Sequence, residues 1–149
     1  MKIYLASDHG GFELKEKIKK HLEEAGRQVI DLGPEELNPE DDFPDFAVPL
    51  AEKVAQDQEN LGIVLCRNGV GVEVAANKID GVRAALSWEP QHAASSREDD
   101  NSNVLALPAD YLEEKKAFEI VDKWVSTPYK GEARFERRLK KIEKEEDER

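Results

Sequence analysis

The residues best suited to chemistry lie around Cys66, the only cysteine of the chain. Cys66 follows the apolar run Ile63-Val64-Leu65 and precedes a turn that contains Gly69 and Gly71. We expect the thiol to lie beside backbone N–H groups and the start of a helix, whose field favours the thiolate. A thiolate in this place could act as a base or a nucleophile. Taken alone, a cysteine also fits a small buried apolar residue.

Asp8 and His9 form a second candidate pair at the end of the first apolar stretch. Both side chains are chemically capable, although an aspartate ahead of two glycines also fits a turn and a helix cap. The chain has three histidines, and they are too few and too scattered along the sequence to suggest a metal site. The glycine turn lacks the third glycine of a dinucleotide fingerprint, because Val74 occupies that position. We therefore expect no metal and no nicotinamide or flavin cofactor.

Apolar runs and helical periodicity alternate along the chain, which predicts the elements that position these residues. Strands are expected at 2–7, 28–32, 63–65, 82–87 and 103–107. Helices are expected at 12–25, 46–56, 72–78, 89–97, 111–125 and 134–148. The segment 33–45 is rich in proline and acidic residues and is expected to be an exposed loop.

This alternation predicts an α/β fold with a doubly wound five-stranded parallel sheet, a Rossmann-like arrangement of flavodoxin-type order, and an additional C-terminal helix. Ligands of such sheets bind outside the carboxyl ends of the strands, where the strand order reverses. With the order 2-1-3-4-5, the reversal lies between the first and third strands. Asp8 and His9 would then lie beside the segment 66–71.

Composition limits the partners. The 149 residues carry a net charge of −11, which disfavours binding to nucleic acid or to an anionic membrane, so local cations must hold any anionic ligand. We expect one domain over 1–149, with a frayed tail at 143–149. A strand pattern begins at Lys2, and the one cysteine forms no internal disulfide, so we expect a cytoplasmic protein.

Together these motifs resemble the type B ribose-5-phosphate isomerases and the galactose-6-phosphate isomerase subunits. The resemblance covers nearly the whole chain. It is carried by the segments 6–15, 42–47, 66–78, 81–84, 103–106 and 134–142. It implies an aldose–ketose isomerase that works without a metal or another cofactor, through a cis-enediolate.

The resemblance also implies roles for individual residues. Cys66 would be the base, and the N–H groups of the turn would stabilise the developing oxyanion. Arg134 and Arg138 would hold the phosphate from a neighbouring subunit, so the site would be shared within a homodimer or tetramer. The expected catalytic residues are Cys66, Asp8 and Asp99. The expected substrate-binding residues are His9, Arg67, Asn68, Gly69, Gly71, Asp100, Arg134 and Arg138.

The sequence departs from the family pattern around this site. Arg67-Asn68-Gly69 replaces the usual Gly-Thr-Gly, and Asp110 replaces an arginine that contacts the phosphate. Asp99 and Asp100 stand where the family has its ring-opening histidine and an asparagine. Asp99 could serve as the acid for ring opening, or it could pair with Arg67 or Arg134.

These departures leave other functions open. The chain could be a catalytically silent or substrate-shifted relative that binds a sugar, or a structural subunit of a mixed oligomer. It could also isomerise an acyclic sugar, which needs no ring-opening acid. A flavodoxin-like nucleotide-binding module is the least favoured alternative, because the third glycine is missing.

Overall fold

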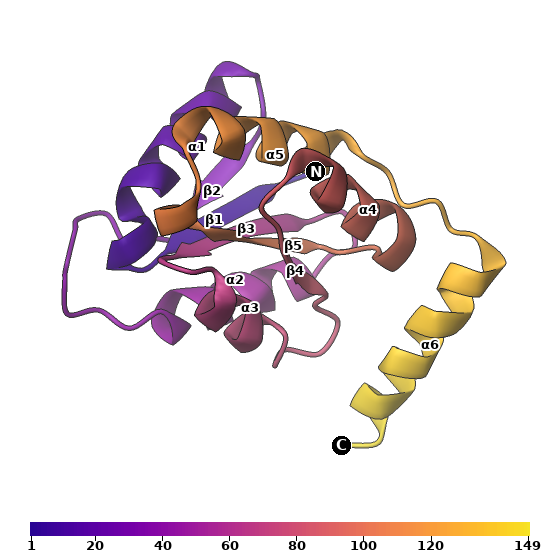
Figure 1. The fold of residues 1–149 in the computed structure, drawn as a ribbon. Coiled ribbons are helices and arrows are strands. Elements are labelled where there is room, and N and C mark those ends of the chain that lie inside the picture. The colour runs from indigo at the N-terminus through magenta and orange to yellow at the C-terminus, as the bar shows by residue number, and fades with distance from the viewer.

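The chain folds around one five-stranded sheet (Figure 1). The computed structural model describes all 149 residues. All neighbouring strands are parallel, in the order β2-β1-β3-β5-β4. The strands are β1 (Ile3–Ser7), β2 (Val29–Asp31), β3 (Leu61–Cys66), β4 (Ala84–Leu86) and β5 (Val104–Pro108). The predicted α/β class with a parallel sheet is confirmed.

Helices cover both faces of the sheet, as predicted (Figure 1). Side chains alternate between the two faces along a strand. Ile3 and Leu5 of β1 therefore belong to the core beneath α1 and α5, whereas Tyr4 and Ala6 belong to the core beneath α2 and α3. The helices are α1 (Phe12–Glu24), α2 (Pro44–Ala55), α3 (Val70–Ala76), α4 (Pro90–Asp100), α5 (Glu114–Ser126) and α6 (Ala133–Asp147). Two 3₁₀ turns, η1 (His9–Gly11) and η2 (Ala109–Tyr111), follow β1 and β5.

The order of the last two strands differs from the expected 2-1-3-4-5. β5 lies inside the sheet between β3 and β4, and β4 forms the edge. Composition suits this order, because the five-residue apolar run Val104–Pro108 is buried throughout as an interior strand, whereas the shorter Ala84–Leu86 is only partly buried as an edge strand. The reversal of winding between β1 and β3 is as expected.

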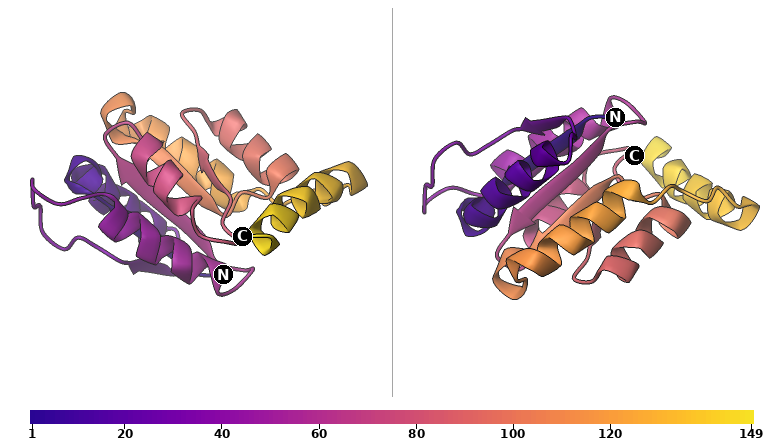
Figure 2. Two further views of the ribbon diagram at one scale, coloured as in Figure 1. Left: turned by 90° about the horizontal axis from the view of Figure 1, so that it is seen from below. Right: turned by 90° about the horizontal axis from the view of Figure 1, so that it is seen from above.

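The last helix, α6, projects from the side of the molecule (Figures 1 and 2). It buries Phe135 and Leu139, whereas Ile142 on the same helix is 53% exposed. α6 reaches Asp147, and Glu146 accepts hydrogen bonds from the backbone N–H of Gly81. No helix of the structure combines the length and apolar character required to cross a lipid bilayer.

Candidate active site

Asp8 and Cys66 lie next to each other at the carboxyl edge of the sheet, on adjacent strands. Ser7 is in register with Leu65, and the backbone N–H of Asp8 donates to the carbonyl of Leu65 at 3.2 Å. Asp8 is 7% exposed and Cys66 is 5% exposed. The reversal of strand order between β1 and β3 therefore brings Asp8 and Cys66 to neighbouring positions where sheets of this type bind ligands.

The Asp8 carboxyl is held at the start of η1. Its Oδ1 accepts the backbone N–H of Gly11 at 3.2 Å. Burial raises the pKa of Asp8 above its ordinary value of 3.8, against the lowering effects of the Gly11 hydrogen bond and the nearby His9. Asp8 therefore binds a proton more readily than an exposed aspartate does, which suits proton exchange with a hydroxyl group.

The turn after Cys66 presents unpaired backbone donors. Asn68 Oδ1 accepts the N–H of Val70 at 3.0 Å, and the Cys66 thiol donates to the same oxygen at 3.7 Å. The N–H groups of Asn68, Gly69 and Gly71 have no hydrogen-bond partner in the protein. Gly69 has φ +74°, and a Cβ there would lie 3.0 Å from the backbone of Leu107. Glycine therefore permits a tight turn with N–H groups available to a ligand.

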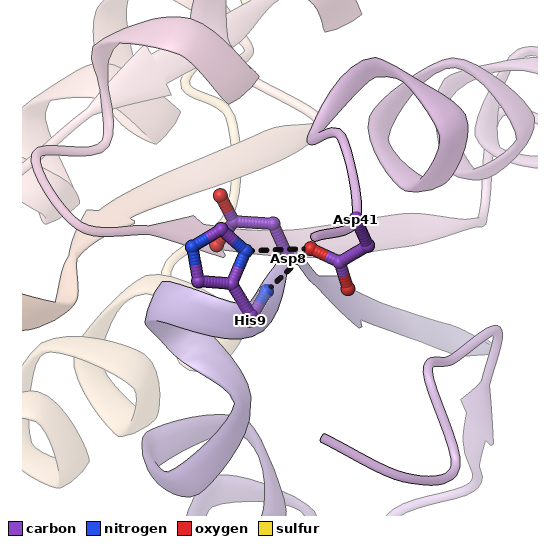
Figure 3. A group of neighbouring side chains, drawn as sticks. All are labelled: Asp8, His9 and Asp41. Carbon is purple, nitrogen blue, oxygen red and sulfur yellow. Dashed lines mark hydrogen bonds and ion pairs between the residues drawn. The ribbon is translucent and has the colours of Figure 1, made fainter. Parts of the chain in front are cut away.

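His9 is bound by a residue that the sequence interpretation missed, Asp41 (Figure 3). Asp41 Oδ1 accepts the backbone N–H of His9 at 2.9 Å and lies 2.7 Å from His9 Nδ1. We expected the loop 33–45 to be exposed, but the Asp41 side chain is only 7% exposed. The only sequence signal was the cluster of acidic residues, which is also typical of a solvated loop.

Asp8, His9 and Asp41 each offer a ligand atom, and these atoms lie within 4.8 Å of one another. Ligand atoms of a metal site are separated by similar distances. Because the three histidines are far apart in the sequence, we did not predict that one of them would lie near two carboxylates. The hydrogen bond between His9 and Asp41 already accounts for part of this closeness.

A buried lysine fixes the start of the loop that carries Asp41. Lys15 of α1 is fully buried, and its Nζ donates to both carboxylate oxygens of Asp31, at 3.0 and 2.9 Å, and to the Pro34 carbonyl at 3.0 Å. At the far end of the loop, the Phe43 ring lies so close to Gly71 that a Cβ there would be 2.8 Å from it. The loop is therefore anchored on both sides of Asp41.

Arg67 lies at the same edge and pairs with Asp110, which follows β5. Arg67 Nη1 is 3.5 Å from Asp110 Oδ1, and the backbone N–H of Asp110 donates to the Arg67 carbonyl at 2.9 Å. The Arg67 side chain crosses Gly10, where a Cβ would clash with its Cγ. A cation and an anion therefore lie together at the edge of the crevice.

Four expected site residues lie far from Cys66 within the same chain. α4 starts at the carboxyl end of β4 and runs back toward the amino end of β5, so its last turn lies at the opposite edge of the sheet. α5 also returns to that edge before α6 begins. The residues concerned are Asp99 and Asp100 at the end of α4, and Arg134 and Arg138 on α6.

The ion pairs suggested for Asp99 are not formed. Arg67 pairs with Asp110, and Arg134 Nε pairs with Glu132 at 3.2 Å. Arg67 and Asp99 lie at opposite edges of the sheet. Arg67 is at the carboxyl edge, whereas Asp99 is at the end of α4, which has returned to the amino edge.

Comparison of the sequence with known proteins identifies the family of this chain. The sequence profile of the family described as Ribose/Galactose Isomerase matches residues 3–142. The chain belongs to this family. This membership confirms the resemblance that the sequence motifs indicated. It also confirms the predicted activity, which is that of an aldose–ketose isomerase acting on sugar phosphates.

Individual members of the ribose/galactose isomerase family are similar over almost their full length. The probable ribose-5-phosphate isomerase B of Mycoplasma pneumoniae is 45% identical over 140 residues, which cover 94% of this chain and 91% of the relative. The structure of ribose-5-phosphate isomerase B from Mycoplasma genitalium with bound ribulose-5-phosphate superposes with a TM-score of 0.95 and 42% identity, covering 99% of this chain and 97% of that one. The type B enzyme of Trypanosoma cruzi also gives a TM-score of 0.95, at 32% identity over 100% of both chains.

Proposed function

We propose that the protein interconverts ribose 5-phosphate and ribulose 5-phosphate, with Cys66 as the base. The observation that carries this proposal is the position of two buried residues, Cys66 and Asp8, at the ends of adjacent strands where the strand order reverses. The relative from Mycoplasma genitalium binds ribulose-5-phosphate, which supports this substrate.

The proposed reaction moves one proton between carbons and one between oxygens. The Cys66 thiolate removes the proton from C2 of the open-chain aldose, and the electron pair forms the C1–C2 double bond while the carbonyl electrons move to O1. The thiol then returns the proton to C1 of the cis-enediolate. Asp8 and His9 transfer the proton of O2 to O1 as the C2 carbonyl forms, so no oxidant or reductant is consumed.

The turn after Cys66 supplies electrostatic stabilisation in this scheme. Negative charge develops on O1 as the enediolate forms. The N–H groups of Asn68, Gly69 and Gly71 are unpaired and close to the thiol in sequence, so they are the donors available to that oxygen. Donors fixed in advance at such a site lower the barrier because they need no reorganisation during the reaction.

We infer that a second copy of the chain completes each site, in a homodimer or a tetramer. Arg134 and Arg138 are exposed cations on a projecting helix, and in their own chain they lie far from Cys66. Ile142 on the same helix leaves apolar surface uncovered. In a neighbouring copy, the two arginines would hold the phosphate, Asp99 would supply the acid for ring opening, and Asp100 would contact the sugar.

We propose that residues 1–149 act as one isomerase domain and that they do so in the cytoplasm. The proposed base is a free thiol, and a reducing compartment keeps such a thiol available.

The direct test is isomerisation of ribose 5-phosphate by the purified wild type, Cys66→Ala and Asp99→His, with the exposed Lys20→Ala as a control. We expect turnover by the wild type and the control, and a loss of about 100- to 10,000-fold in Cys66→Ala, the range for removal of a general base. Equal rates for wild type and Cys66→Ala would refute the proposal. An inactive wild type with an active Asp99→His would identify a substrate-shifted relative.

The acidic residues support a second candidate function. Asp110 pairs with Arg67, and neither Asp99 nor Asp100 can hold a phosphate. A less charged or acyclic sugar would be less sensitive to these negative charges. A faster reaction with an acyclic sugar than with ribose 5-phosphate would favour this candidate, and inactivity of the pure protein with every sugar would favour a silent subunit of a mixed oligomer.

A further inference from the structure

Asp41 is the one residue of the 33–45 loop whose carboxylate contacts a proposed substrate-binding side chain. It is 32 positions from His9 in sequence, and one of its oxygens meets two nitrogens of that residue, the backbone N at 2.9 Å and Nδ1 at 2.7 Å. Anchoring of the loop by Lys15 and Phe43 brings the carboxylate to this place.

These two contacts fix the protonation pattern of the imidazole. A carboxylate oxygen only accepts hydrogen bonds, so at 2.7 Å the Nδ1 atom must carry a proton. In the neutral ring Nε2 then carries the lone pair. Figure 3 shows that this nitrogen points away from Asp41. The free nitrogen of His9 is therefore not engaged by Asp41, and the Asp8 side chain lies in the same group of residues.

The burial of the Asp41 carboxylate destabilises the folded state. Its side chain is only 7% exposed, and its Oδ2 is buried without a hydrogen-bond partner. An unpaired buried oxygen of a charged group is destabilising, and neither contact of Oδ1 relieves it. This arrangement is accounted for if the carboxylate acts on His9.

We propose that Asp41 is a positioning residue, which holds His9 in the Nδ1–H tautomer and directs Nε2 toward a substrate hydroxyl. The catalytic part of this proposal rests on the proposed isomerase function. A neutral Nε2 accepts the hydroxyl proton, and after transfer it donates the same proton back, so that His9 can assist the exchange between O2 and O1.

Two substitutions of Asp41 separate its effect on the orientation of the His9 ring from the effect of its negative charge. In Asp41→Asn, the backbone N–H of His9 favours the amide oxygen at the position of Oδ1, so the oxygen still accepts from Nδ1. We expect kcat/KM to stay within about threefold of wild type, whereas Asp41→Ala loses about 10- to 100-fold, as when the hydrogen-bond partner of a functional histidine is removed. Glu40→Ala removes the adjacent exposed carboxylate of the same loop and is expected to match wild type.

A double-mutant cycle tests whether Asp41 acts through His9. We expect Asp41→Ala to cost nothing further in a His9→Ala background, because the side chain that it orients is already gone. If Asp41→Ala costs the same factor in both backgrounds, the carboxylate does not act through His9 and the proposal is wrong.

Nitrogen NMR of the three histidines gives a readout that does not depend on activity. With the His9→Ala spectrum used for assignment, we expect His9 to be the Nδ1–H tautomer in the wild type and in Asp41→Asn, and a mixture shifted toward Nε2–H in Asp41→Ala. An unchanged tautomer in Asp41→Ala would overturn the proposal. If the wild type fails to isomerise ribose 5-phosphate, the proposed function fails, and the NMR result still decides whether Asp41 positions His9.

Discussion

The Arg67 guanidinium and the Asp110 carboxylate face each other at 3.5 Å, at the ends of the neighbouring strands β3 and β5. Both side chains are roughly half exposed, so the pair contributes little to stability. Its main effect is electrostatic, because Asp110 partly neutralises the cation adjacent to Cys66.

Removal of this neutralising charge should improve binding of a phosphorylated sugar. We expect Asp110→Ala to lower the KM for ribose 5-phosphate by about threefold to fivefold, the equivalent of one exposed charge interaction, and Arg67→Ala to raise it by a similar factor. Glu24→Ala, which breaks the exposed pair with Lys20 on α1, serves as the control. A higher KM in Asp110→Ala would show that Asp110 helps the substrate to bind.

The buried charge of Asp8 is expected to lower the stability of the folded protein while supporting catalysis. Burial raises the pKa of Asp8, so its stabilising contribution is present below the ordinary value of 3.8 and is lost as pH rises through the folded-state pKa. At pH 7, Asp8→Asn removes the cost of a buried charge while its amide oxygen can still accept from Gly11. We expect a higher Tm and a lower kcat. A lower Tm at pH 7, with no change in kcat, would contradict both parts.

The Lys15–Asp31 pair should dominate the stability of the first half of the fold. Burial alone would raise the pKa of Asp31, but hydrogen bonds from Lys15, Gly33 and Lys19 outweigh it and hold the pKa below 3.8. The pair therefore contributes stability above pH 3.8 that is lost as pH falls through the lower folded-state pKa.

We expect Lys15→Met to lower the free energy of unfolding by about 3–5 kcal/mol in urea at pH 7, because it leaves Asp31 without its main partner. Lys20→Met, on the exposed face of the same helix, is the matched control and should change stability by less than about 0.5 kcal/mol. Equal midpoints for the two variants would show that Lys15 is dispensable.

The proposed sharing of the site between two copies predicts complementation between inactive variants. Cys66→Ala lacks the base, and Arg138→Ala lacks a phosphate contact that belongs to the neighbouring site. If the two are unfolded and refolded together as dimers, half of the dimers are mixed and each of these has one intact site, so about a quarter of the wild-type activity returns. No recovery in a mixture that demonstrably contains mixed dimers would show that Arg138 serves the site of its own chain.

The sequence predicted the centre of the sheet well, because β1 and β3 are largely apolar runs, the first followed by Asp8 and the second ending in Cys66. It could not place β4 relative to β5, because a helical crossover can lead to the adjacent position or skip one. In the structure the longer apolar run, β5, takes the buried interior position, and the three-residue β4 takes the partly exposed edge.

The remaining differences concern contacts between distant segments. Asp41 reaches His9 only because Lys15 and Phe43 hold the loop between β2 and α2, and acidic composition alone did not reveal this. The positions of Asp99 and Arg134 depend on where α4 and α6 end in three dimensions, and their proposed roles depend on a second copy of the chain.

The most direct test of the Cys66 mechanism follows the proton itself. Ribose 5-phosphate with deuterium at C2 is incubated in ordinary water with the wild type or with Cys66→Ala, and the label is followed by NMR. We predict that the wild type moves part of the deuterium to C1 of ribulose 5-phosphate and releases the rest to water, while Cys66→Ala leaves it at C2. Loss of deuterium from C2 at the wild-type rate in Cys66→Ala would contradict the central claim, because another group would then be the base.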